Sequence, residues 1–139
     1  MNTMRTSIRT LAACAGLLVM PLHPHAADTV TLSEGFRFVE QDGESLYRAV
    51  CQGCHMPDGQ GATGAGAYPA LAANPRLAGA AYAVHNVLHG RKGMPPFKDM
   101  LTDAQVAAVV NHVRTHMGNT YTDAVTAADV RKQRQEKPR

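Results

Sequence analysis

The sequence predicts a small all-α fold of three to four short helices. Three segments carry apolar residues at helical spacing, and they begin at Asp42, at residue 79 and at Thr102. No stretch shows the alternation of polar and apolar residues that is typical of a half-buried strand. The core is thin, because the 139-residue chain has no Trp and only 5% aromatic residues. Such a domain needs a further source of buried apolar surface.

The first predicted helix runs into the pentapeptide Cys51-Gln52-Gly53-Cys54-His55. Asp42 is its expected N-cap, and Leu46, Tyr47 and Val50 form its apolar stripe. The motif C-x-x-C-H is the attachment signature of a c-type haem. Two thiols three residues apart lie on neighbouring faces of one helical turn, which suits addition to two vinyl groups on one porphyrin edge. A covalently held haem would also supply the missing apolar surface.

Two other interpretations of the motif use the same cysteines. A thioredoxin-like redox pair would need a surrounding βαβ pattern, which the sequence does not show. A zinc site would need further ligands, and the H-x-x-x-H pairs His85/His89 and His112/His116 have suitable spacing. Both pairs lie in predicted amphipathic helices, where histidines four residues apart often share a solvated face. Haem attachment is the favoured interpretation, and zinc stays open on spacing alone.

A loop rich in glycine and proline follows the motif over residues 57–75, and its composition predicts no regular element. Its glycines would let backbone lie close to a flat ligand. The second predicted helix covers residues 79–90 and ends at Gly90. The third begins with the capping box Thr102 to Gln105 and is the clearest amphipathic helix of the chain.

The N-terminal residues 1–27 read as a secretory signal peptide, with Arg5 and Arg9 before an apolar run of about ten residues. That run is too short to span a hydrocarbon layer of about 30 Å, so export to the periplasm is expected, with no transmembrane segment in the mature chain. Cys14 precedes most of the apolar run, which favours a discarded signal over a lipid anchor. Residues 28–41 are expected to form an irregular arm.

Basic residues gather in two places. The segment 120–139 ends in a basic run, which is expected to be a solvated tail, with a docking element as the alternative. Arg91, Lys92 and Lys98 flank Met94 and are either solubilising surface or a rim that steers acidic partners. The formal charge of +3, without interleaved aromatic residues, does not indicate nucleic-acid binding.

A haem iron held by His55 has a sixth position to fill or to leave open. Met94 is the best candidate, because it lies in a loop between two predicted helices where two prolines stiffen the backbone. Met117 and Met100 read as core filler. The full set of candidates downstream of His55 comprises Met56, His85, His89, Met94, Met100, His112, His116 and Met117.

These motifs carry a family resemblance. The motif Cys51–His55, the glycine loop leading to Tyr68-Pro69-Ala70-Leu71, the loop Gly93-Met94-Pro95-Pro96-Phe97 and the last helix together resemble class I cytochromes c. The match covers roughly residues 40–118. A looser resemblance, of residues 101–119 and the short tail, is to haem subunits and acceptors of bacterial periplasmic dehydrogenases.

The resemblance implies a cytochrome c domain over residues 42–119 around one covalent haem c. Cys51 and Cys54 would form the thioethers, and His55 and Met94 would be the axial iron ligands. The carbonyl group of Pro69 would accept the other ring N–H of His55. The family often packs an aromatic residue of the last helix against the first, whereas His112 and Met117 occupy these places here, which puts that contact in doubt.

The resemblance also implies a function, which is one-electron transfer without a catalytic site of its own. The expected redox partners are a periplasmic dehydrogenase as donor and a terminal oxidase or another cytochrome as acceptor. The alternatives are a haem subunit within a dehydrogenase complex and, in a different class, an open-site haem enzyme or gas binder in which Met94 does not bind iron.

Overall fold

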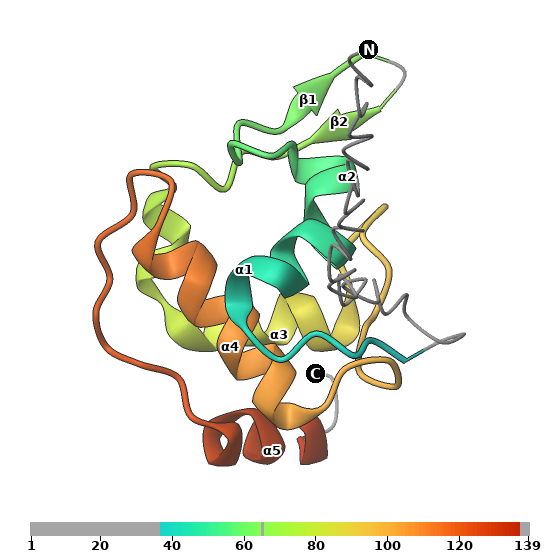
Figure 1. Cartoon of the computed structure of the whole chain (residues 1–139), viewed down its shortest axis with the longest axis vertical. Helices are drawn as coiled ribbons and strands as arrows, with labels where there is room; N and C mark the ends of the chain where they lie inside the picture. The colour runs from blue at the N-terminus through green and yellow to red at the C-terminus, as the bar shows by residue number, and fades with distance from the viewer. Residues whose placement is uncertain (1–36, 65, 137–139) are drawn as a thin grey trace, which may run out of the picture. The chain divides into compact units, whose positions relative to one another are not determined.

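The computed structural model of the chain describes residues 37–64 and 66–136, and these residues form a mostly helical domain (Figure 1). The predicted all-α class is confirmed. The α-helices are α1 (Gly43–Leu46), α2 (Gln52–His55), α3 (Ala80–His89), α4 (Asp103–Thr115) and α5 (Ala127–Gln135). A π-helical turn, η1 (Tyr47–Cys51), joins α1 to α2 without a break, and a 3-10 turn, η2 (Pro75–Ala78), precedes α3. None of the helices in this described part is long and apolar enough to cross a membrane.

The helix ends follow the sequence signals closely. Asp42 caps α1 and accepts a hydrogen bond of 2.8 Å from the backbone N–H of Ser45. The capping box of α4 is present, with Thr102 and Gln105 each bonded to the other's backbone N–H at 2.9 and 3.2 Å. Gly90 ends α3 at a φ of +71°. The π turn carries no such signal: the N–H of Gln52 donates to the carbonyl of Tyr47, five residues back.

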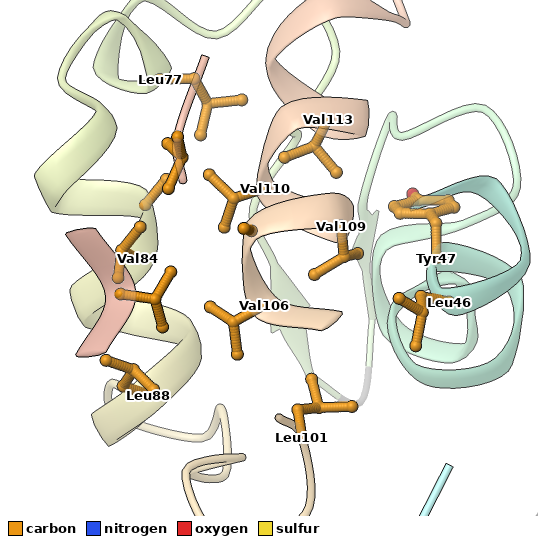
Figure 2. Close-up of a cluster of buried hydrophobic side chains, with 14 residues drawn as sticks. Leu46, Tyr47, Leu77, Val84, Leu88, Leu101, Val106, Val109, Val110 and Val113 are labelled. Carbon is orange, nitrogen blue, oxygen red and sulfur yellow. The ribbon is translucent and has the colours of Figure 1, made fainter. Parts of the chain in front are cut away.

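Helix α4 forms the centre of the hydrophobic core (Figure 2). Its valines point to both sides, toward Val84 and Leu88 of α3 on one side and toward Leu46 and Tyr47 of the first helical segment on the other. Each of these side chains is at most a few per cent exposed. The core valines of α4 are Val106, Val109, Val110 and Val113. The apolar residues whose spacing predicted this helix therefore form the surface on which α3 and the first helical segment both pack.

A close helix crossing joins α1 to α4. A Cβ atom on Gly43 would lie 2.4 Å from the carbonyl oxygen of Ala108 and 2.6 Å from Cβ of His112. One turn later the rings of Tyr47 and His112 are in contact, with centroids 5.7 Å apart and planes tilted by 41°. The contact that the sequence left in doubt is thus present, with His112 in the place of an aromatic residue and a glycine that lets the two backbones meet.

Two expectations about irregular segments were wrong. Within the glycine-rich loop, β1 (Ala62–Thr63) and β2 (Ala67–Tyr68) form a short antiparallel pair. The C-terminal residues expected as a solvated tail form α5, which packs against α4 and α3 and buries Val130 completely. A single apolar residue among many charges gives almost no periodic signal, so this packing was not apparent from the sequence.

Two arginines tie the C-terminal part to the core. The guanidinium group of Arg114 is fully buried and donates to the carbonyls of Leu77 at 2.9 Å and Ala78 at 3.3 Å, and to the Asp123 carboxylate at 2.6 Å. Arg134 of α5 binds the carboxylate of Asp103 at 2.7 Å and donates to the carbonyls of Lys98 and Leu101. The bonds of Arg134 connect α5 to the start of α4 and to the loop that precedes it.

Gln105 binds the described end of the N-terminal arm. Gln105, only 2% exposed, donates its amide group to the carbonyls of Phe38 at 2.7 Å and Glu40 at 2.8 Å. The predicted signal peptide, Cys14 and most of the arm lie outside the described residues.

Candidate haem site

The two cysteines of the motif occupy different environments. Cys51 ends η1 and is half-buried, whereas Cys54 lies on the exposed side of α2. Burial, and to a lesser degree the neighbouring Cys54, raises the pKa of the Cys51 thiol to about 12. A redox dithiol of the thioredoxin type needs a lowered thiol pKa, so this environment disfavours that interpretation. In the described part of the chain, no group of three or more His, Cys, Asp or Glu side chains has the arrangement of a metal site, so zinc gains no support.

His55 is the most constrained residue of the motif. Its side chain is 9% exposed, and its ring Nδ1 lies 2.8 Å from the carbonyl oxygen of Pro69. A carbonyl oxygen only accepts, so Nδ1 carries the proton and Nε2 is the basic nitrogen of the ring. The histidine therefore presents an oriented electron pair, which is the arrangement typical of metal-bound imidazoles.

The backbone at His55 and directly after it is also fixed. The carbonyl oxygen of His55 accepts from the N–H of Gly61 at 3.0 Å, and the carbonyl of Met56 accepts from the phenol of Tyr47 at 2.7 Å. Burial, with a smaller contribution from the charge of Asp58, raises the pKa of Tyr47 to about 12, so its phenol remains a donor at neutral pH. Tyr47 thus links the α1–α4 crossing to the turn that follows His55.

The glycine loop folds back onto the segment that carries Pro69. Gly59 accepts hydrogen bonds from the N–H groups of Leu71 at 2.7 Å and Ala72 at 2.9 Å. Gly61 has a φ of +68°, and a Cβ atom there would lie 2.2 Å from the carbonyl oxygen of Tyr68. The close approach that Gly61 permits is to the chain's own backbone, whereas the expected approach to a flat ligand stays a prediction.

Met94 lies in a tight turn fastened to the end of α3. Its backbone exchanges two hydrogen bonds of 3.0 Å with Arg91, and the N–H of Phe97 donates to the carbonyl of Val87 at 3.0 Å. The site of a Cβ atom on Gly90 is 2.4 Å from the carbonyl of Met94, so only glycine fits there. The side chain of Met94 is half-buried. The loop is held by α3 independently of the motif.

The basic residues around Met94 are exposed. Arg91 donates to the phenol oxygen of Tyr82 at 2.6 Å, while Lys92 and Lys98 are both on the surface. The hydrogen bond to Tyr82 therefore fixes the orientation of the Arg91 guanidinium group, which carries one of the three charges.

Sequence reasoning missed the residues that hold the Pro69 segment. Asn119 is 4% exposed and bonds to the segment at two points, and Asn74 donates its side-chain amide to the carbonyl of Ala70 at 2.7 Å. The only sequence signal was an asparagine directly after Gly118, and its burial, which requires partners for the amide, became known only from the structure.

The residues fit a covalently held haem. The donor set comprises two thiols and one oriented imidazole within a single helical turn, and half-exposed apolar side chains occur on the surrounding segments. These apolar side chains include Val50, Leu71, Val87 and Phe97.

Comparison with protein families agrees with this fit. The model of the family described as "Cytochrome C oxidase, cbb3-type, subunit III" matches residues 39–113, more than half of the chain. The chain belongs to this cytochrome c family. It is an electron-transfer domain that carries a covalently bound haem c, and Cys51, Cys54 and His55 form its C-x-x-C-H motif.

Individual relatives are also c-type cytochromes. The chain is 35% identical over 107 residues to the fructose dehydrogenase cytochrome subunit of Gluconobacter japonicus, which covers 66% of this chain and 21% of that protein. It is 33% identical over 101 residues to cytochrome c-552 of Thermus thermophilus, covering 61% and 66% of the two chains. It is 35% identical over 105 residues to the cytochrome c subunit of the quinone alcohol dehydrogenase of Gluconacetobacter polyoxogenes, covering 66% and 22%.

The cytochrome domain thus spans about a fifth of the length of the dehydrogenase subunits that it matches. A solved c-type cytochrome is similar over 53% of this chain and 95% of its own, with 32% identity and a TM-score of 0.47.

Proposed function

We propose that this cytochrome is a periplasmic one-electron carrier in which His55 and Met94 are the axial iron ligands. The bound haem supplies a one-electron Fe(III)/Fe(II) couple, and His/Met ligation sets that couple at a high potential. Cys51 and Cys54 would hold the macrocycle covalently. The protein's part is to orient His55, to hold Met94 on a fixed loop and to keep both in place as electrons enter and leave.

The observation that carries the proposal is the 2.8 Å contact between Nδ1 of His55 and the carbonyl of Pro69. It fixes the tautomer and the ring direction, and a donated proton makes the other nitrogen a stronger base. Since Pro69 itself lies in a segment bonded to the glycine loop and to Asn119, the imidazole is oriented by the fold.

The Met94 loop supports the second ligand. A thioether is a weak ligand, so it depends on a backbone that brings it to the iron without cost in chain entropy. The paired hydrogen bonds between Arg91 and Met94, and the bonds of Phe97 and Lys98 to α3, supply such a backbone.

Ligation by Met94 is tested with two methionines of the same loop region. Met94→Ala in the oxidised holoprotein should abolish the red charge-transfer band of a methionine–iron bond and allow carbon monoxide to bind the reduced protein at neutral pH. Met100 is also half-buried and serves as the matched control, and Met100→Ala should retain the band. If wild-type protein lacks the band and binds carbon monoxide, the open-site alternative replaces this proposal.

The proposed partners are a periplasmic dehydrogenase as donor and a terminal oxidase or another cytochrome as acceptor, approached through Arg91, Lys92 and Lys98. Exposed charges of one sign raise the rate of association with an oppositely charged partner, and salt screens the effect. Replacing all three with Gln should lower the association rate and its salt dependence without changing the absorption spectrum. The control replaces the exposed Arg48, Arg131 and Lys132 with Gln. Equal losses in both variants would contradict a specific rim.

A second candidate is a haem subunit that stays within a dehydrogenase complex. The specific support is the similarity to cytochrome subunits of a fructose dehydrogenase and a quinone alcohol dehydrogenase. Affinity purification of the natively expressed protein separates the two: a stoichiometric larger flavin or quinone subunit indicates the complex, and a haem protein of about one chain's mass indicates the free carrier.

A further inference from the structure

We propose that Asn119 is a positioning residue for the iron ligand His55, because it anchors the backbone segment that presents the Pro69 carbonyl. The inference rests on the proposed ligation by His55. Asn119 does not touch His55, and it acts through the segment 69–74.

The side chain of Asn119 uses its polar atoms to join two parts of the chain. Its Nδ2 donates to the carbonyl of Leu71 and to the carbonyl of Val113, each at 2.8 Å. Its Oδ1 accepts from the backbone N–H of Asn74 at 2.9 Å. One residue, 4% exposed, therefore clamps both ends of a four-residue stretch to the end of α4.

The same stretch has two further supports. The N–H of Ala73 donates to the carbonyl of Met117 at 3.0 Å, and Asn74 Nδ2 donates to the carbonyl of Ala70 at 2.7 Å. Ala70 is the residue directly after Pro69. The bonds of Asn119 are thus transmitted over two residues to the carbonyl that accepts the His55 proton at 2.8 Å.

This placement has a consequence at the iron. A short Nδ1–H···O=C bond gives the imidazole partial imidazolate character and makes Nε2 a stronger donor, which favours the ferric state. Without Asn119, the partly buried carbonyl of Leu71 loses its donor, and the segment gains freedom to move away from His55. The His55 bond weakens, and the reduction potential rises.

Asn111 provides a matched control. It is a half-buried asparagine of α4, and both ends of its amide bond to backbone: its Oδ1 accepts from the N–H of Val125 at 2.8 Å, and its Nδ2 donates to the carbonyl of Val125 at 2.9 Å. Its partners lie in the segment before α5, on no path to Pro69. Asn111→Ala removes similar bonds with a similar loss of stability.

The test compares Asn119→Ala and Asn111→Ala as full-length holoproteins. For Asn119→Ala we expect the equilibrium constant for reduction to rise about threefold, which is about 28 mV at 59 mV per tenfold for one electron. We also expect faster solvent exchange of the His55 Nδ1 proton, measured by NMR in the reduced protein, by about tenfold. Asn111→Ala should leave the potential unchanged and speed the exchange only as far as its lower global stability requires.

Three results would overturn the inference: no change of potential in Asn119→Ala, no excess exchange of the His55 proton, or equal shifts in both variants. Should Asn119→Ala fail to retain haem, Asn74→Ala removes the bond to the Ala70 carbonyl and is expected to shift potential and exchange in the same directions. The proposed ligation is tested separately in wild-type protein, where iron-shifted ring resonances of His55 in the oxidised state establish it whatever the variants show.

Discussion

The crossing of α1 over α4 makes Gly43→Ala an informative perturbation. The new Cβ atom would lie 2.4 Å from the Ala108 carbonyl oxygen, where an ordinary contact begins at 3.4 Å, so the helices must separate by 1.0 Å at this point. A gap of 0.5–1 Å forfeits roughly a quarter to a half of the attraction between facing atoms. The atoms affected belong to the buried contacts of Leu46 and Tyr47 with α4.

Two opposing effects set the size of the change. Alanine in place of a helical glycine stabilises by roughly 0.5–1 kcal/mol, and less at the first residue of a helix. Overpacking of a tight contact costs about 1–3 kcal/mol. Overpacking wins, so Gly43→Ala should lower the free energy of unfolding by about 1–2 kcal/mol, or the melting temperature by about 10 °C for a domain of this size.

The assay is thermal and denaturant unfolding of the holoprotein followed by circular dichroism. The control is Gly79→Ala, at an exposed glycine outside the C-x-x-C-H motif, where a Cβ atom would make only ordinary contacts, at 3.7 Å with Tyr82 and 3.9 Å with Arg76. It should change the free energy of unfolding by less than about 0.5 kcal/mol. A Gly43→Ala variant as stable as this control would refute the close crossing.

Three further perturbations test other parts of the fold. Arg114→Met leaves three backbone carbonyls, those of Leu77, Ala78 and Asp123, without their donor and should cost about 3 kcal/mol in urea unfolding. Asp123→Asn, at a side chain 71% exposed, should cost less than about 1 kcal/mol. Burial, and then the neighbouring His116, lowers the pKa of His112 below 6.5, so the unfolded chain binds a proton at this histidine more readily than the folded chain. The free energy of unfolding should therefore fall as the pH drops below 6.5, and it should fall less steeply in His112→Phe. Arg134 bonds to the carbonyls of Lys98 and Leu101, which follow Met94, so Arg134→Ala should lower the free energy of unfolding by about 1–2 kcal/mol and also lower the pH at which the methionine–iron band disappears. Arg131→Ala, at a side chain 66% exposed, should do neither.

Local signals in the sequence predicted local structure well. The capping residues Asp42 and Thr102, the stop at Gly90 and the valine period of α4 all lie where short-range rules place them. The C-x-x-C-H motif predicted a covalent haem c, since the spacing of two thiols and an imidazole is itself the chemical requirement. These features depend on residues a few positions apart.

The contact between His55 and Pro69 is a different case. The sequence suggested it only through a family resemblance, because nothing in either residue specifies a partner fourteen positions away. In the structure it is present, and its support comes from Asn119, a residue still further along the chain. The roles of His55 and Met94 at the iron stay predictions.

By itself, then, the sequence determined the helical segments that begin at Asp42, at residue 79 and at Thr102, and it determined the attachment chemistry, because each of these is set within one or two turns of chain. Only the tertiary structure decided that α5 packs on the core, that Gly43 lets α1 cross α4, that Arg114 is buried and that Asn119 anchors the Pro69 segment. Those features depend on which distant surfaces meet. A lone buried Val130, a helical glycine or a polar side chain shows its role only when its partner in space is known.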